Sequence, residues 1–195
     1  MPVNPAEAKL FADLAQEAAA NPPTPLDQQT ISEFRGNMIF VKEFTGSASD
    51  VSFIDQQVPA RDGYQIPIRI YHPDITAPGP VLIMFPGCGY MLPNFEINAI
   101  ACSRIAKYSG VKVILVDYRL APENPLPVSI YDGYDAARYI ATHHEIFKID
   151  PSKIFIGGMS SGAHCAAVVT NLARQDHDWK IHHQILLVSI LKNSG

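Results

Sequence analysis

The stretch GMSSG, residues 158–162, has the residue types and spacing of a serine nucleophile. It fits the pattern G-x-S-x-G, in which a sharp turn between a strand and a helix exposes a serine. Centring the pattern on Ser161 would require glycine where Met159 and Ala163 stand, so Ser160 is the candidate. An apolar run precedes the motif and an alanine-rich run follows it, as this setting requires. We expect a serine placed for nucleophilic chemistry, and the alternative is an ordinary strand-to-helix turn without chemistry.

A second glycine-rich stretch, PGCGY at residues 86–90, also follows an apolar run, VLIMF at 81–85. Small residues after a strand let backbone N–H groups approach a substrate carbonyl oxygen, which is how an oxyanion hole is formed. In the first stretch, the N–H of Ser161 begins the predicted helix, whose partial positive end favours a developing oxyanion. The two stretches therefore support each other as parts of one site.

Hydrophobic periodicity predicts the elements that would position these residues. Helices are expected at 6–20, about 27–35, 94–108, 128–144 and 162–174. Two alternating strands around the turn Arg61-Asp62-Gly63 predict a β-hairpin at 51–58 and 66–71. Continuous apolar runs predict buried strands at 81–85, 111–116, 153–156 and 184–190. The alternation of strands and helices predicts an α/β fold with a doubly wound, mostly parallel sheet.

The composition excludes several classes of function. The 195 residues are 47% hydrophobic and 17% charged, which is the profile of one globular domain. A formal charge of −4 provides no basic stripe for nucleic acid, and no apolar run reaches the roughly 20 residues that span a bilayer. No signal peptide is readable, and Cys88, Cys102 and Cys165 fit neither a disulfide framework nor a zinc site. We expect a cytoplasmic protein with reduced thiols and no metal or organic cofactor.

Three motifs in order, PGCGY (86–90), DYRLAPE (117–123) and GMSSGAH (158–164), resemble the hormone-sensitive-lipase-like carboxylesterases of the α/β-hydrolase superfamily. In that family the motifs read approximately HGGG, DYRLAPE and GDSAGG. The resemblance covers essentially the whole chain, and DYRLAPE is long and specific. It implies a helical cap segment at residues 1–45 and the N-terminal portion of an α/β-hydrolase core at 46–195, in a single domain overall.

The resemblance also implies roles for individual residues. Ser160 would be the nucleophile that forms an acyl-enzyme. The amides of Cys88, Gly89 and Ser161 would form the oxyanion hole, with Gly87 shaping the turn. The substrates implied are small-molecule esters with small to medium acyl chains, hydrolysed without a cofactor.

The motifs of this chain depart from the family's motifs at three positions. Pro86 stands where the family has histidine, which removes side-chain hydrogen bonds but no oxyanion N–H. Cys88 replaces a glycine and would introduce strain if that position requires positive φ. Met159 stands where the family usually has aspartate. We expect an oxyanion hole that is altered and still present.

A serine nucleophile also needs a base and an orienting carboxylate, and in this superfamily an Asp or Glu and then a His follow the serine. After Ser160 the chain offers these candidates: Asp176, Asp178, His164, His177, His182 and His183. His164 lies one turn along the elbow helix, at a packing position. The last three histidines follow that helix, which returns the chain by roughly 20 Å to the far edge of the sheet. We expect these three, together with His72, His143 and His144, to be solvated loop residues.

The triad acid and base are therefore expected to be absent from this chain, and its activity as an enzyme is doubtful. By resemblance the strand at 184–190 is internal to the sheet, so ending shortly after it would leave an apolar edge that invites pairing. Three explanations remain open. The sequence is a fragment of a longer esterase; or it is a catalytically dead relative that binds a small ligand or partner; or a second chain, as a homo-oligomer or strand-donating partner, supplies the missing strands.

Overall fold

The computed structural model describes residues 5–20, 30–38, 51–72 and 76–187. The chain divides into two compact units, residues 1–38 and 39–195. The second unit contains the sheet and both glycine-rich stretches, so it contains the candidate site.

The first unit consists of two helices, α1 (Pro5–Ala20) and α2 (Ile31–Met38). The sequence predicts α1 almost to the residue, whereas α2 begins four residues later than expected. A capping box sets this start, because Thr30 and Glu33 satisfy each other's backbone N–H groups. The Glu33 Oε2 atom accepts from the N–H of Thr30 at 2.8 Å, and the Thr30 hydroxyl accepts from the N–H of Glu33 at 3.3 Å.

The second unit is built on a mixed sheet, which has six strands among the described residues, in the order β1-β2-β4-β3-β5-β6. The strands are β1 (Phe53–Pro59), β2 (Gln65–Tyr71), β3 (Gly79–Phe85), β4 (Lys112–Val116), β5 (Ile149–Met159) and β6 (His183–Leu187). The first two form the expected antiparallel hairpin, and the other four run parallel to one another. The expected mostly parallel sheet is confirmed. Of the predicted last strand, residues 188–190 lie outside the described part of the chain.

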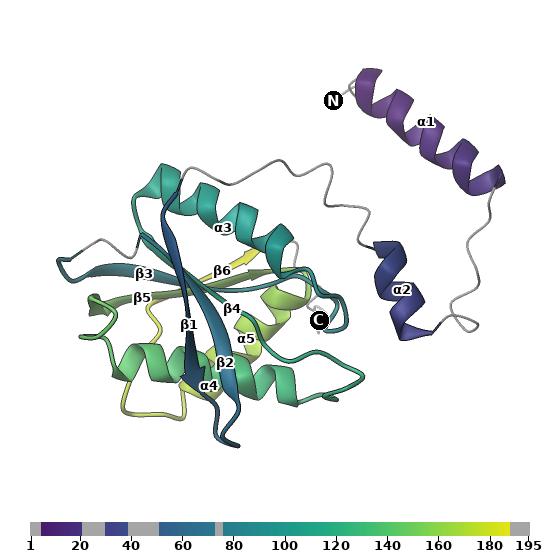
Figure 1. Cartoon of the computed structure of the whole chain (residues 1–195). Helices are drawn as coiled ribbons and strands as arrows, with labels where there is room; N and C mark the ends of the chain where they lie inside the picture. Colours follow the sequence, from purple (N-terminus) through teal and green to yellow (C-terminus); the bar gives the residue numbers. More distant parts are fainter. Residues whose placement is uncertain (1–4, 21–29, 39–50, 73–75, 188–195) are drawn as a thin grey trace, which may run out of the picture. The chain divides into compact units, whose positions relative to one another are not determined.

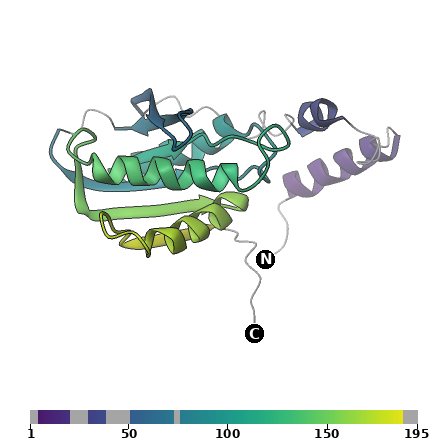
Figure 2. The ribbon, with the colours of Figure 1, turned by 90° about the horizontal axis from the view of Figure 1, so that it is seen from below.

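Helices cover both faces of this sheet (Figures 1 and 2). One face packs against α3 (Phe95–Ser109), through Ala99, Cys102 and Ala106. The other face packs against α4 (Val128–Thr142) and α5 (Ser161–Ala173). The parallel strands are buried on both faces, which explains their unbroken apolar sequences. This arrangement confirms the doubly wound prediction.

The strand order places the candidate site at a topological switch point. From β3 the chain crosses to β4 on one side, and it then returns to β5 on the other side. Ligands of open α/β sheets bind at the carboxyl ends of the strands where the order reverses in this way. The register pairs Phe85 with Gly158, so the residues that follow β3 and β5 begin side by side. These are the two stretches that the sequence singles out.

A buried ion pair fixes the loop that follows β4. The guanidinium of Arg119 binds Asp132 of α4 through Nε and Nη2, at 2.9 and 2.7 Å, and the N–H of Arg119 donates to the same carboxylate. The Asp132 carboxylate is almost fully buried. Such a charge is tolerated in the interior only when it is paired and hydrogen-bonded, as here. The DYRLAPE stretch is therefore tied to α4.

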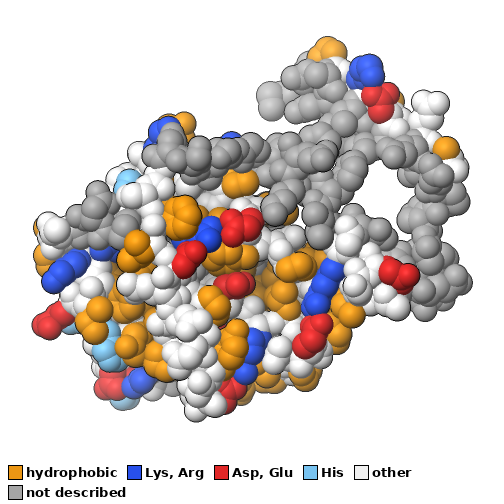
Figure 3. All heavy atoms as spheres, in the orientation of Figure 1, with side chains coloured by type: hydrophobic (Ala, Val, Ile, Leu, Met, Phe, Trp, Pro, Cys, Tyr) orange, Lys and Arg blue, Asp and Glu red, His pale blue; other side chains and the backbone are white. Residues whose placement is uncertain are grey.

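The surface of the described residues mixes charges of both signs. Basic and acidic side chains lie next to one another on the face shown in Figure 3. Arg69 bridges Asp55 and Glu96, and Arg61 pairs with Asp135. In the ranges that the structure describes, no helix has the length and hydropathy needed to cross a membrane.

A hydrogen-bonded carboxylate joins α4 to the connection between α5 and β6. Asp176 accepts from the N–H of Asp178, the hydroxyl of Tyr134, the Nε of Arg138 and the indole N–H of Trp179. These donors, with the Asp178 N–H as the largest contributor, hold the pKa of the Asp176 carboxyl well below its usual range. The ionised carboxylate is therefore a structural tie at the end of the sheet opposite the switch point.

Replacing Asp176 with asparagine should reduce the free energy of unfolding at pH 7 by about 1–3 kcal/mol, because donors lose their charged acceptor. A carboxylate whose pKa is lowered by folding stabilises the fold above its unfolded pKa, and this contribution is lost as the pH falls. The difference between wild type and variant should therefore shrink below about pH 4. Urea unfolding at pH 7 and pH 3 measures it.

The control is Asp178→Asn, since that side chain is 66% exposed and pairs only with Arg138. It should change the free energy of unfolding by less than about 1 kcal/mol. Equal effects of the two variants at pH 7 would contradict the special role of Asp176.

Candidate active site

The turn at Ser160 has the geometry expected of a nucleophile elbow. Strand β5 ends at Met159 and α5 begins at Ser161, which leaves Ser160 alone at the tip. Its φ is 54° and its ψ is −121°. A non-glycine residue in such a sparsely populated region costs about 1–3 kcal/mol and persists only where its surroundings enforce it. The expected strained serine is therefore present in the structure.

Backbone hydrogen bonds enforce this conformation from both sides. The N–H of Ser160 donates to the carbonyl of Leu187 in β6 at 2.9 Å. The carbonyl of Ser160 accepts from the N–H groups of Ala163 and His164, at 3.0 and 3.2 Å, in the first turn of α5. Ser160 is thus held between a neighbouring strand and its own helix.

Glycines allow three backbone segments to meet at this turn. A Cβ on Gly158 would collide with the backbone of Gly162, and a Cβ on Gly162 would collide with the carbonyl of Phe85. On the other stretch, a Cβ on Gly87 would lie 2.6 Å from the carbonyl oxygen of Met159. No side chain fits at any of these positions. The elbow and the PGCGY loop are therefore in direct backbone contact.

The PGCGY loop is anchored by a buried asparagine of α3 that sequence reasoning did not identify. The Asn98 Oδ1 atom accepts from the N–H of Gly87 at 2.9 Å, and its Nδ2 donates to the carbonyls of Asn94 and Gly87, at 2.8 and 3.3 Å. Asn98 is only 5% exposed. Nothing in the helical pattern of 94–108 distinguishes this residue from a surface asparagine.

Positive φ angles in this loop fall on Gly89 and Tyr90, at 57° and 62°. Cys88 does not have positive φ, so the condition under which its side chain would introduce strain is not met. Its side chain is instead buried against a tyrosine, with Cys88 Sγ 3.0 Å from the Tyr118 hydroxyl. The same hydroxyl donates to the carbonyl of Pro86 at 2.7 Å. The Cys88 side chain is therefore a buried hydrogen-bonding partner of Tyr118.

Burial raises the pKa of the Cys88 thiol and that of the Tyr118 phenol. Desolvation disfavours the charged form of each group, so both remain protonated at neutral pH. A reactive cysteine would require a lowered pKa. These two groups therefore act as hydrogen-bond partners, and Ser160 is the only nucleophile that the motifs predict in this site.

The two loops border a small, open cavity of about 330 Å³ beside Ser160. Of the predicted site residues, Ser160, Gly87, Cys88 and Gly89 line it, together with Leu92, Asn94 and Met159. Ser161, the remaining predicted residue, is 1% exposed and lies behind the loop. Its hydroxyl accepts from the N–H groups of Cys88 and Gly89, at 2.9 and 2.8 Å. The structure thus brings all five predicted residues together.

The alpha/beta hydrolase fold family matches residues 82–194, which include both loops and the strands between them. This chain belongs to that family. The predicted resemblance to carboxylesterases and the expected α/β-hydrolase fold are confirmed.

Among curated proteins, this α/β-hydrolase chain is 32% identical over 130 residues to the carboxylic ester hydrolase LipN of Mycobacterium tuberculosis. It is also 32% identical over 120 residues to an ethyl acetate hydrolase of Pseudomonas putida. The alignments cover 66% and 60% of this chain, and 34% and 38% of those proteins. Among solved structures, it resembles a hyperthermophilic esterase of Pyrobaculum calidifontis, with 28% identity and a TM-score of 0.82, covering 97% of this chain and 59% of that one. The chain therefore spans well under two thirds of the length of these relatives.

In the part of the α/β-hydrolase chain that the structure describes, no histidine side chain is hydrogen-bonded to Ser160. His164 is the nearest in sequence, and its Nδ1 is paired with the hydroxyl of Tyr90 at 2.7 Å. The two rings are in edge contact, with centroids 5.9 Å apart. His164 is therefore a packing residue, as the sequence predicts.

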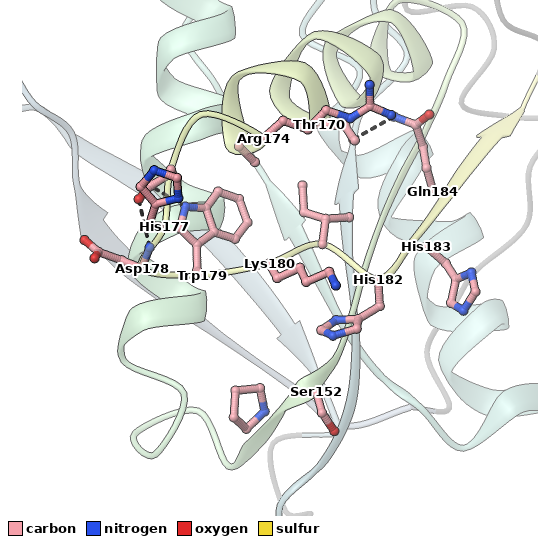
Figure 4. Close-up of a pocket in the computed structure, with 14 residues that line it drawn as sticks. Ser152, Thr170, Arg174, His177, Asp178, Trp179, Lys180, His182, His183 and Gln184 are labelled. Carbon is pink, nitrogen blue, oxygen red and sulfur yellow. Dashed lines mark hydrogen bonds between the residues drawn. The ribbon is translucent and has the colours of Figure 1, made fainter.

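The other candidate histidines lie around a separate groove of about 940 Å³ (Figure 4). His177, His182 and His183 line it together with Asp176 and Asp178, at the connection between α5 and β6 and the start of β6. Ser160 does not line this groove. This placement agrees with the prediction that the three histidines lie away from Ser160. The structure describes no cluster of histidine, cysteine and carboxylate side chains that could hold a metal ion among the ranges it covers.

The prediction that six histidines are solvated loop residues is wrong for three of them. His183 is exposed, but it is the first residue of β6. The His72 ring is partly buried, with Nε2 2.9 Å from the carbonyl of Ala106. The His182 Nδ1 atom is buried without a hydrogen-bond partner. The backbone N–H of His182 donates to the carbonyl of Ile154 in β5. The burial of His72 and His182 results from packing against neighbouring elements, which the sequence alone does not reveal.

Replacing Gly162 with alanine in this α/β-hydrolase chain should lower the free energy of unfolding by about 2–4 kcal/mol, because the new Cβ would overlap backbone atoms that cannot move aside. Gly79→Ala is the control, since its Cβ would meet nothing nearer than 3.9 Å. It should change stability by no more than about 1 kcal/mol. Thermal or urea unfolding of both variants measures the difference. A Gly162→Ala protein as stable as Gly79→Ala would contradict the close backbone contact.

Proposed function

We propose that this chain carries the nucleophile and the oxyanion hole of a carboxylic ester hydrolase that acts on small to medium acyl esters. The observation that carries the proposal is the strained conformation of Ser160, held at the switch point and facing the glycine loop across the cavity. Strain of this kind is maintained at sites where it positions a reacting group. The printed names of the relatives, among them an ethyl acetate hydrolase, support an ester as substrate.

In the proposed reaction the Ser160 Oγ attacks the carbonyl carbon of the ester, while the hydroxyl proton passes to a base. The carbonyl oxygen becomes an oxyanion, which the amides of Cys88, Gly89 and Ser161 stabilise, as does the N-terminus of the 13-residue α5. Gly87 keeps the loop in contact with the elbow because it has no side chain. The alcohol then leaves, and Ser160 carries the acyl group.

The same proposal limits the activity of the chain by itself. We expect the acid and base of the triad to come from residues outside this sequence, because His164 is paired with Tyr90 and the histidines that follow it line a separate groove. Without them the oxyanion hole and binding supply only about 10³ to 10⁴-fold acceleration over water. Acylation and deacylation both use the base, so both should be slow. Acylation by an activated ester, whose leaving group needs no proton, should be the less affected step, so with such a substrate the acyl group should accumulate on Ser160.

We further propose residues 1–45 as a helical cap segment and 46–195 as the portion of the hydrolase core, in a cytoplasmic protein that needs no cofactor. Strand β6 is the last strand of the described sheet, and Ile185 and Leu187 in it are each 41% exposed. Apolar strands with a free edge favour pairing with another strand. We propose that such a strand comes from a partner chain, either a second copy or another protein.

Incubation with a short-chain p-nitrophenyl ester tests the nucleophile. We expect one acyl group per chain by intact mass, released p-nitrophenol close to one equivalent, and little turnover after that. Ser160→Ala should show neither signal. The control Ser152→Ala removes an exposed serine whose hydroxyl donates to Asp150, and should behave as wild type.

Each of two results would overturn part of the proposal. Acylation that persists in Ser160→Ala, or that is absent from wild type, removes Ser160 as the nucleophile. Sustained turnover that depends on Ser160 contradicts the absence of a base from the chain.

A further inference from the structure

The two amides predicted to bind the oxyanion already have an acceptor inside the protein. The N–H groups of Cys88 and Gly89 both point at the hydroxyl oxygen of Ser161, at 2.9 and 2.8 Å. Each backbone N–H carries a single hydrogen, so it makes one full hydrogen bond at a time. A substrate oxyanion would need the same two hydrogens. The Ser161 hydroxyl and the substrate oxygen therefore compete for them.

The position of this hydroxyl makes the competition persistent. Ser161 is 1% exposed, and as the first residue of α5 its backbone is fixed by the helix. Its hydroxyl interacts with the side chains of Tyr118 and Cys88, which contact each other. The Tyr118 hydroxyl donates in turn to the carbonyl of Pro86. Buried polar groups that are hydrogen-bonded to one another are held rigidly. The Ser161 hydroxyl is therefore held as the acceptor of the two amides.

The Ser161 hydroxyl is buried away from the surface of the cavity. Cys88 and Gly89 line the cavity beside Ser160, whereas Ser161 does not. The amide hydrogens that should face a bound ester are thus directed at a group behind the loop. The loop must shift, or the Ser161 side chain must rotate, before these amides can support attack by Ser160.

We propose that the Ser161 hydroxyl is an autoinhibitory plug of the oxyanion hole, which holds the amides of Cys88 and Gly89 away from the substrate. Its effect on reaction rate rests on the proposed function of Ser160. A purely structural role for Ser161 predicts the opposite sign, because removing a buried acceptor would loosen the site and lower reactivity. With the plug removed, the amides are free for the substrate oxygen and reactivity rises.

Residue-resolved amide hydrogen exchange tests the plug without any reaction. In Ser161→Ala the amides of Cys88 and Gly89 should exchange about tenfold faster than in wild type, because each loses its acceptor. The amide of Gly87 is an internal control, since its acceptor is Asn98 and its exchange should not change. Ser161→Gly removes the same hydroxyl together with Cβ, and should show the same local change. Unchanged exchange at Cys88 and Gly89 in both variants overturns the proposal, as does equal acceleration at Gly87.

The matched control variant is Ser103→Ala. It also removes a buried serine hydroxyl, one that donates to the carbonyl of Ile100 within α3. Its amides at Cys88 and Gly89 should exchange at the wild-type rate. Acceleration in this variant equal to that in Ser161→Ala would show general loosening and overturn the proposal.

Labelling with an alkyl fluorophosphonate then tests the catalytic consequence. The Ser160 oxygen bonds to phosphorus, fluoride leaves, the hydroxyl proton goes to solvent, and the P=O oxygen occupies the oxyanion hole. The rate constant, followed by intact mass, should rise about tenfold in Ser161→Ala and stay unchanged in Ser103→Ala. An equal or lower rate in Ser161→Ala overturns the plug. If no variant is labelled at Ser160, the proposed nucleophile fails, and the amide exchange alone decides whether the hydroxyl occupies the two amides.

Discussion

The parallel pairing of β3 with β5 is the constraint on which the candidate site depends. Because Phe85 lies opposite Gly158 in that register, the two strands deliver their following loops to the same point. A shift of one residue in either strand would point Ser160 away from the PGCGY loop. The strands are held in register by side chains packed on both faces, and the glycines then let the loops approach without a side chain between them. Ser160 is therefore positioned by the core of the sheet.

Several polar groups around Ser160 already have hydrogen-bond partners inside the protein. The amides near it are bonded to Asn98 or to Ser161, and the thiol and phenol beneath the loop are protonated and paired. Such a site is preorganised, which is what electrostatic stabilisation of an oxyanion requires. The amides of Cys88 and Gly89 are, however, bonded to the hydroxyl of Ser161 inside the protein. The sequence motif alone does not reveal this. The residues of an oxyanion hole can be present while their hydrogens are committed elsewhere.

Sequence reasoning predicted the fold and singled out the strained serine because both follow from local patterns. The apolar runs mark strands buried on both faces, and only Ser160 satisfies the glycine spacing. The role of Asn98 was invisible, since an asparagine in a helical pattern carries no sign of what it will meet 11 residues away in the chain. The hydroxyl of Ser161 was visible, and the resembling motif has alanine there, but its bonds depend on a loop 72 residues earlier. The partly buried His72 and His182 were missed for the same reason, because tertiary packing decides their exposure.

The bond from the Ser160 N–H to the Leu187 carbonyl has a mechanical consequence. It connects the strained turn to β6, the outermost strand that the structure describes. The register pairs Met159 with Leu187, so this bond continues the ladder between β5 and β6 up to the turn. A displacement of β6 along β5 would therefore move the acceptor of the Ser160 N–H, and the dihedral angles of Ser160 would change with it.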